Sequence, residues 1–267
     1  METPVLPGLE LTLIIDWMTQ FFFLSLRIGA FLLAGPGFGG RYVPLPIRIV
    51  ATMVLTLPLM GRVDVPPAEQ IAQLAAFHLI LNELIIGLSG GLTLTILFAA
   101  AAIAGDRIAN TAGLGFAAQM DPSAGAQVPV IAQIFGMFLL MIFVSTDSHL
   151  VAFRIVLDSY LYLPPGDIPN PAALIAGGLT AGMQMFTLGM KIMLPVVATL
   201  LLLNMMVGVF TRSAPQLNVF SFGFPITISA TLVLLFLTVP GTADAFDRPL
   251  QDGLNMLVDI YTEAANG

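Results

Sequence analysis

Long uncharged apolar runs constrain the fold of this chain more than any other feature of its sequence. Residues 84–105, 122–146 and 213–243 contain no charged side chain. About 20 consecutive apolar residues suffice to cross a hydrocarbon core roughly 30 Å thick. Only 9% of the 267 residues are charged and 57% are hydrophobic, whereas a soluble domain carries roughly 25% charged residues. The sequence therefore predicts a membrane protein.

The apolar runs predict an all-α membrane protein with about six long, kinked apolar helices arranged in hairpins. We expect these helices at residues 11–33, 44–61, 71–104, 128–144, 172–210 and 219–239. The third and fifth runs are too long for one upright crossing at about 1.5 Å per residue. These two helices must therefore tilt, kink or extend beyond the lipid.

The first apolar run is expected to stay in the mature protein. Glu2, Glu10 and Asp16 occur before its apolar core, and the first basic residue is Arg27. A cleaved signal peptide would instead carry basic residues before its apolar core.

The loop between the third and fourth runs, residues 105–127, is rich in glycine and alanine. Leu114, Phe116 and Met120 are isolated bulky side chains within it. Exposed backbone cannot lie in lipid, so this loop must lie in water or be buried against protein or in a cavity. Two interpretations stay open: a plug, or an ordinary loop whose apolar side chains pack on the nearest helix.

Two charges, Glu83 and Lys191, lie deep inside apolar runs. An ion at the middle of a bilayer costs about 2.5 to 3.5 kcal/mol on insertion scales, so each should be paired, face water or lie outside the lipid. Their opposite signs suggest a buried ion pair that locks two helices. Snorkelling side chains and a role in proton or ion translocation are the alternatives.

Catalytic and metal-binding motifs are absent from the sequence. The chain has no cysteine, which excludes disulfides and thiolate sites. His78 and His149 lack the spacing of a zinc-binding HExxH motif, and neither a GxSxG elbow nor a phosphate-binding glycine loop occurs. The segment that begins at Asp147 instead reads as an interfacial helix, because its apolar residues recur every three or four positions. We expect no enzyme, no cofactor, no metal and no nucleic-acid partner.

The segment RSAPQLNVFSFGFPI, residues 212–226, resembles the signature of the flagellar FliR family, which includes related proteins of virulence type III secretion. It is a polar, proline-bracketed break between two apolar runs, as in that family. Ala230 stands where the family would have glycine. Other pieces that agree in order are Arg27 and Gly29, the turn from residue 35 to Arg48, Glu83 and Gly87, residues 105–122 and 147–149, Ser159, Pro164, Gly166, Pro195, Asn204 and Gly208.

The resemblance implies a core subunit of the flagellar type III protein export gate. Family members assemble with FliP and FliQ into a closed helical channel, through which unfolded export substrates cross the inner membrane, and FlhB and FlhA contact this assembly. The chain itself resembles a fusion of FliP-like and FliQ-like subunits. It would be a multi-pass protein of the flagellar basal body, in a gate partly raised toward the periplasm. A virulence secretion gate and, from another class, a secondary transporter or a lone scaffold are the alternatives.

The resemblance also maps two sites onto this sequence. In the plug, Leu114, Phe116 and Met120 would fill the lumen, and Gly113 and Gly115 would supply hinge freedom. The tip of the last hairpin would contact FlhB. Its residues are Arg212, Pro215, Gln216, Asn218 and Phe220. Ordinary hairpin capping is the alternative for this tip, since Pro215 disfavours helical geometry at Ala214.

We expect a single integral membrane domain over residues 1–267. Its parts are N-terminal hairpins (1–104), a plug-like loop (105–127), a helix plus interfacial helix (128–171), a C-terminal hairpin (172–243) and an acidic tail (244–267).

Overall fold

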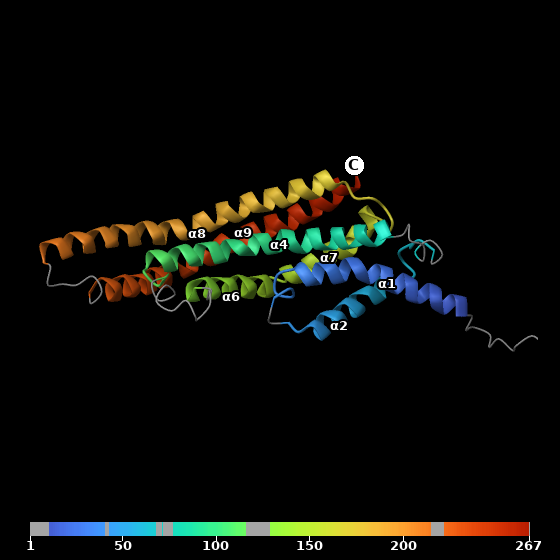
Figure 1. The fold of residues 1–267 in the computed structure, drawn as a ribbon, viewed down its shortest axis with the longest axis horizontal. Helices are drawn as coiled ribbons and strands as arrows, with labels where there is room; N and C mark the ends of the chain where they lie inside the picture. The colour runs from blue at the N-terminus through green and yellow to red at the C-terminus, as the bar shows by residue number, and fades with distance from the viewer. Residues whose placement is uncertain are drawn as a thin grey trace, which may run out of the picture. The chain divides into compact units, whose positions relative to one another are not determined.

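The computed structural model describes residues 11–40, 43–67, 71, 77–115, 129–214 and 222–266. Within these ranges the chain forms seven α-helices and one short 3-10 helix, with no strand, which confirms the all-α prediction (Figure 1). The helices are α1 (Leu11–Ala34), α2 (Leu45–Thr56), η1 (Leu57–Leu59), α4 (Phe77–Thr111), α6 (Val130–Ser145), α7 (Ser148–Tyr162), α8 (Pro171–Ser213) and α9 (Phe224–Ala265).

Fewer helices than expected are long and apolar enough to cross a membrane. In the described part of the chain three qualify, within α1, α4 and α8, and a fourth is reached if α6 and α7, bent by 69°, count as one broken span. The helix pair α2 and η1, and the apolar part of α9, Phe224–Thr238, are shorter. By this criterion the described part of the chain supports three or four of the six expected spans.

Two boundaries differ from the expected ones. Helix α4 continues to Thr111, so the loop expected from residue 105 begins with helix. Helix α9 continues to Ala265, and the expected acidic tail is therefore helical. Apolar residues one turn apart explain this continuation, since Phe246, Leu250 and Leu254 are all buried.

The chain divides into two compact units, and the division cuts α4, α8 and α9 and separates Ser148 from the rest of α7. Unit 1 contains residues 1–95, 149–181 and 253–267, and unit 2 contains residues 96–148 and 182–252. Within unit 1, α1 and α4 approach closely because α4 has glycines where they meet. A Cβ atom on Gly91 would lie only 2.7 Å from the Phe31 carbonyl oxygen. Small residues of this kind allow helix backbones to pack tightly.

Unit 2 has an apolar core built around small residues of α4. Ala100, Ala101 and Ala104 are fully buried there, and a Cβ atom on Gly105 would collide with the backbone of Ala132 in α6. Larger side chains from α6, α8 and α9 fill the rest: Ile131, Phe135, Leu139, Leu188, Ile192, Val196, Leu200 and Phe246. Gly105 is thus a packing residue inside a helix, where the sequence suggested the start of a loop.

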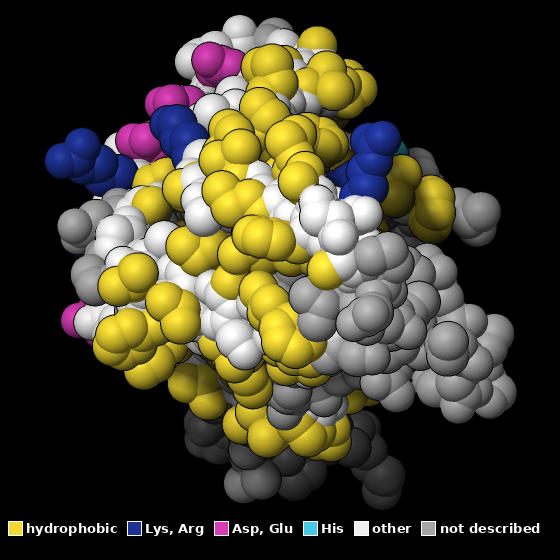
Figure 2. Space-filling model, turned by 90° about the vertical axis from the view of Figure 1, so that its left-hand side faces the viewer, with side chains coloured by type: hydrophobic (Ala, Val, Ile, Leu, Met, Phe, Trp, Pro, Cys, Tyr) yellow, Lys and Arg dark blue, Asp and Glu magenta, His cyan; other side chains and the backbone are white. Residues whose placement is uncertain are grey.

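Much of the apolar surface of α8 is left exposed by the described part of the chain. Only 17% of its most apolar window is buried, against 50% for α4. Figure 2 shows hydrophobic side chains over much of the face that it presents, with few charged ones. Contiguous apolar surface of this extent marks contact with lipid or with other proteins. The described helices therefore agree with the predicted membrane protein.

Candidate functional site

The C-terminal end of α4 is the described part of the predicted plug loop. Gly113 follows the helix with φ of +86°, a conformation that glycine adopts without strain. The Leu114 amide donates to the Ala109 carbonyl at 3.0 Å, and the Gly113 amide donates to the Asn110 carbonyl at 3.1 Å. This pair of bonds is a Schellman motif, which ends helices at a glycine.

Two side chains from other helices of unit 2 complete this end of α4. The amide Nδ2 of Asn204, in α8, donates to the Thr111 carbonyl at 3.0 Å. The buried hydroxyl of Thr227, in the first turn of α9, donates to the Ala112 carbonyl at 3.1 Å. The last carbonyls of a helix have no partner within it, so these side chains bind the groups that the helix leaves free.

The structure describes three of the five predicted plug residues. Gly113 packs against Phe224, because a Cβ atom there would lie 2.6 Å from a carbon of that ring. Leu114 is exposed, and a Cβ atom on Gly115 would collide with Oδ1 of Asn110. Phe116 and Met120 lie outside the described residues. The described part shows how the loop begins and leaves its role as a plug a prediction.

The predicted partner-contact tip is described at one residue only. Arg212 is exposed in the last turn of α8, where a cation interacts favourably with the helix dipole. Pro215, Gln216, Asn218 and Phe220 lie outside the described residues. Contact of this tip with a partner stays a prediction.

The structure corrects the predicted pairing of Glu83 with Lys191. Glu83 is fully buried, as expected, but its partner is Arg27 of α1, with Nε to Oε2 at 2.8 Å and Nη2 to Oε1 at 3.0 Å. Lys191 is exposed on α8 and makes no ion pair or hydrogen bond with any described residue. The planar guanidinium binds a carboxylate through two parallel hydrogen bonds, which an ammonium group cannot do.

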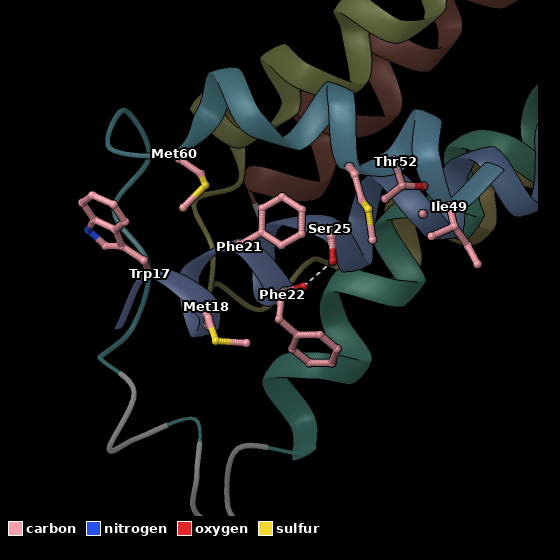
Figure 3. A pocket seen from close by; sticks show the side chains of 10 residues that line it. Trp17, Met18, Phe21, Phe22, Ser25, Ile49, Thr52 and Met60 are labelled. Carbon is pink, nitrogen blue, oxygen red and sulfur yellow. Dashed lines mark hydrogen bonds between the residues drawn. The ribbon is translucent and has the colours of Figure 1, made fainter. Parts of the chain in front are cut away.

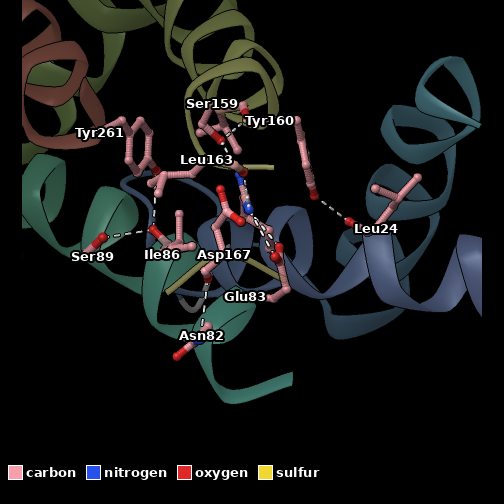
Figure 4. Close-up of polar contacts among 12 residues, drawn as sticks. Leu24, Asn82, Glu83, Ile86, Ser89, Ser159, Tyr160, Leu163, Asp167 and Tyr261 are labelled. Carbon is pink, nitrogen blue, oxygen red and sulfur yellow. Dashed lines mark hydrogen bonds and ion pairs between the residues drawn. The ribbon is translucent and has the colours of Figure 1, made fainter. Parts of the chain in front are cut away.

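Two further N–H groups of Arg27 are bound within unit 1 (Figure 4). Its Nη1 donates to Oγ of Ser159 at 3.0 Å and its Nη2 to the Leu163 carbonyl at 2.9 Å. The guanidinium lies 4.1 Å from the centre of the Tyr160 ring, whose hydroxyl donates to the Leu24 carbonyl at 2.6 Å. We call Arg27, Glu83, Ser159 and Tyr160 the arginine cluster. It joins α1, α4 and α7 through buried groups.

Sequence reasoning missed Arg27 as a functional partner, although a signal was present. Arg27 lies inside the first apolar run, so the cost of burying its charge applies to it as it does to Glu83. Besides Lys191, the sequence therefore offered Arg27 as a second positively charged partner for Glu83, 56 residues away from it.

An apolar groove lies between α1 and α2 in unit 1 (Figure 3). It has a volume of about 610 Å³ and is lined mainly by apolar side chains, including Trp17, Met18 and Phe22. The hydroxyls of its two polar residues, Ser25 and Thr52, donate to carbonyls of their own helices. In the described part of the chain, no group of three or more His, Cys, Asp or Glu residues is placed to bind a metal ion.

Comparisons with known proteins identify relatives over almost the whole chain. Residues 18–253 match the family described as "Bacterial export proteins, family 1". The flagellar biosynthetic protein FliR of Escherichia coli (strain K12) is 30% identical over 252 residues, which cover 93% of this chain and 95% of the relative. FliR of Bacillus subtilis (strain 168) is 33% identical over 231 residues, with coverage of 83% and 86%. The chain belongs to the bacterial export proteins of family 1, the family of the flagellar biosynthetic protein FliR.

Proposed function

We propose that this chain is a core subunit of the flagellar type III protein export gate. In this role it forms, with FliP and FliQ, a closed helical channel through which unfolded flagellar proteins cross the inner membrane. The observation that carries the proposal is the match to FliR over 93% of the chain and 95% of the relative. Members of this family are non-enzymatic components of protein export.

The uncovered apolar surface of unit 2 supports an assembly of several subunits. Along α8 the exposed side chains include Leu201, Leu202, Met205 and Val209, each more than half exposed. FliP and FliQ would cover these side chains, and FlhB and FlhA would contact the assembled gate. Lipid would cover the remaining apolar surface.

The exposure of Lys191 favours a gate that is partly raised from the bilayer toward the periplasm. Its neighbours on α8 include the exposed Met190 and Leu194. A lysine in contact with hydrocarbon at mid-bilayer would cost about 2.5 to 3.5 kcal/mol. Water or a partner subunit beside this residue removes that cost. The gate would reside in the flagellar basal body.

The loop after α4 would act as the plug of this channel. Since α4 ends at Thr111, the loop begins at Ala112, and Leu114, Phe116 and Met120 would supply its apolar obstruction. Gly113 and Gly115 would allow the loop to leave and re-enter the channel. Deleting residues 113–117 should increase ion leak through the gate while the complex still assembles. Wild-type conductance of such a complex would contradict the plug.

The tip of the α8–α9 hairpin would contact FlhB. Arg212 is exposed at the described end of α8, and Pro215, Gln216, Asn218 and Phe220 follow it along the chain. A photo-crosslinker placed at Gln216 should capture FlhB. Failure to capture it in a fully assembled gate would remove this contact from the proposal.

Co-purification tests the function as a whole. The tagged chain, expressed with FliP and FliQ of the same organism, should be isolated as a complex with both, and loss of its gene should abolish export of flagellar proteins. Isolation of a solitary, folded chain that transports a small solute in liposomes would support a secondary transporter instead. An effect confined to a virulence secretion system would assign the chain to that machine.

A further inference from the structure

The end of α4 is held in a way that links it to the two helices on either side of the signature segment. At the helix end itself, backbone amides bind the carbonyls of Ile108, Ala109 and Asn110. The donors are the amides of Ala112, Leu114 and Gly113, in that order. The carbonyls of Thr111 and Ala112 come next in the chain. Both are bound by side chains, Asn204 before the signature segment and Thr227 after it.

We propose that Asn204 and Thr227 are positioning residues that hold the start of the plug loop, Ala112–Leu114, against α8 and α9. We call these two side chains and the two carbonyls they bind the α4 latch. The latch fixes the direction in which the chain leaves α4, and so it sets how tightly the export channel closes. This inference rests on the proposed gate function.

The geometry suits a latch that opens and closes. The Thr227 hydroxyl has one proton and two acceptors at the same distance of 3.1 Å, the Ala112 carbonyl and the Phe224 carbonyl of its own helix. When the loop base moves away, this hydroxyl still has a partner. A buried hydroxyl without a partner would be costly, so the second acceptor lowers the free energy needed for release.

A hollow lies beside the latch and gives its two carbonyls access to a second kind of partner. It has a volume of about 580 Å³, and its lining includes Thr111, Ala112, Asn204 and Thr227 together with Arg107 and Asn110. A hollow of this size has room for water beside its polar lining groups. In the proposed open state, water in this hollow would bind the two carbonyls after the side chains withdraw.

The latch connects the hairpin formed by α8 and α9 to the start of the plug loop. Asn204 lies in α8 two turns or more before Arg212, and Thr227 lies in the first turn of α9. A partner that shifts the tip of this hairpin therefore acts on the two helices that carry the latch side chains.

Ion leak through the assembled gate provides the first test. Thr227→Val removes the hydroxyl at nearly constant shape, Asn204→Ala removes the amide, and Thr227→Ser keeps a donor. Each loss of a hydrogen bond should shift the balance between closed and open states roughly fivefold. Leak should rise by about that factor in each single variant and further in the double variant, with Thr227→Ser near wild type.

Thr231→Val is the matched control. Thr231 lies one turn along α9, is as buried as Thr227, and donates at 2.7 Å to the Thr227 carbonyl within its own helix. This variant loses the same chemical group without touching α4, so its leak should stay at the wild-type level. Equal leak in Thr227→Val and Thr231→Val, at equal amounts of assembled complex, would overturn the latch.

Amide hydrogen exchange tests the latch apart from the gate function. The Gly113 and Leu114 amides are bonded in the Schellman motif, and their exchange should speed up in the Asn204→Ala, Thr227→Val double variant but not in Thr231→Val. Unchanged exchange in the double variant overturns the latch. If deleting residues 113–117 leaves the leak unchanged while exchange responds as expected, the plug fails and the latch stands.

Discussion

The arginine cluster of unit 1 and the α4 latch of unit 2 hold helices together by opposite means. The cluster is charged and buried, and the Arg27 side chain makes four hydrogen bonds, two of them to one carboxylate. The latch is neutral, with one hydrogen bond from each side chain to α4. Separating the cluster would leave the charges of Arg27 and Glu83 buried without a partner, whereas opening the latch leaves the Thr227 hydroxyl with the Phe224 carbonyl as a second acceptor. The comparison indicates a fixed region and a releasable one.

Removing the Arg27 charge should give the largest effect on this comparison. Arg27→Met leaves Glu83 buried and unpaired, which costs about 3 to 5 kcal/mol. We expect loss of most assembled complex, measured as the amount that co-purifies with FliP and FliQ and as its thermal midpoint. Arg154→Ala is the control, since the Arg154 to Asp158 pair is exposed and such pairs contribute about 0 to 1 kcal/mol.

The double variant Arg27→Met, Glu83→Met sharpens the same point. Replacing a buried ion pair by apolar residues of similar volume is often neutral or stabilising, so the double variant should recover much of the lost assembly. If Arg27→Met assembled and melted like the wild type, the arginine cluster would contribute no more to stability than the α4 latch. The contrast between a fixed and a releasable region would then be wrong.

A smaller loss is expected where a glycine brings α4 against the backbone of the cluster. A Cβ atom on Gly87 would collide with the Arg27 carbonyl and lie 2.8 Å from the Ala30 Cβ. Gly87→Ala should therefore destabilise by about 1 to 3 kcal/mol, seen as a lower thermal midpoint. Gly178→Ala in α8, where an added Cβ meets nothing within 4 Å, should be neutral or stabilising. Equal midpoints would show that the two helices separate easily.

Tyr160 allows the ring and the hydroxyl to be tested separately. Tyr160→Phe keeps the ring beside Arg27 and removes the bond to the Leu24 carbonyl, so we expect a loss of about 1 kcal/mol. Tyr160→Leu removes both and should cost more. Thermal unfolding of the purified complex gives both values. Identical midpoints for the two variants would mean that the ring contributes nothing to the cluster.

The position of most helices could be predicted from the sequence, because apolar runs and prolines are local signals. The end of α4 could not, because glycine marks a turn and a close helix contact equally well. Gly105 lies inside the helix against Ala132, and Gly113 ends it with a positive φ. The local sequence does not distinguish the two roles, because any glycine can adopt a positive φ or allow a close helix contact. The contact of Gly105 with Ala132 of α6 shows which role that residue has.

The candidate site was predicted only in part for a similar reason. Glu83 could be recognised as a charge that needs a partner, but Arg27 and Lys191 were both available by charge, and the choice depends on which helices meet. Asn204 and Thr227 lie 93 and 115 residues from the carbonyls that they bind. Their role depends on the carbonyls that the end of α4 leaves free. No sequence spacing indicates that these side chains reach those carbonyls.

Neutralising Lys191 should have the smallest effect, and it checks the corrected pairing. Lys191 is exposed, and its helix already presents Met190 and Leu194 on the surface. Lys191→Met should change the thermal midpoint of the complex by no more than a surface substitution does, about 0.5 kcal/mol in stability. Glu83→Gln should be strongly destabilising whether or not Lys191 is present, because Arg27 carries the pairing. If Lys191→Met instead suppressed the Glu83→Gln defect, the two residues would be coupled, and the separation of a fixed unit 1 from a releasable unit 2 would have to be abandoned.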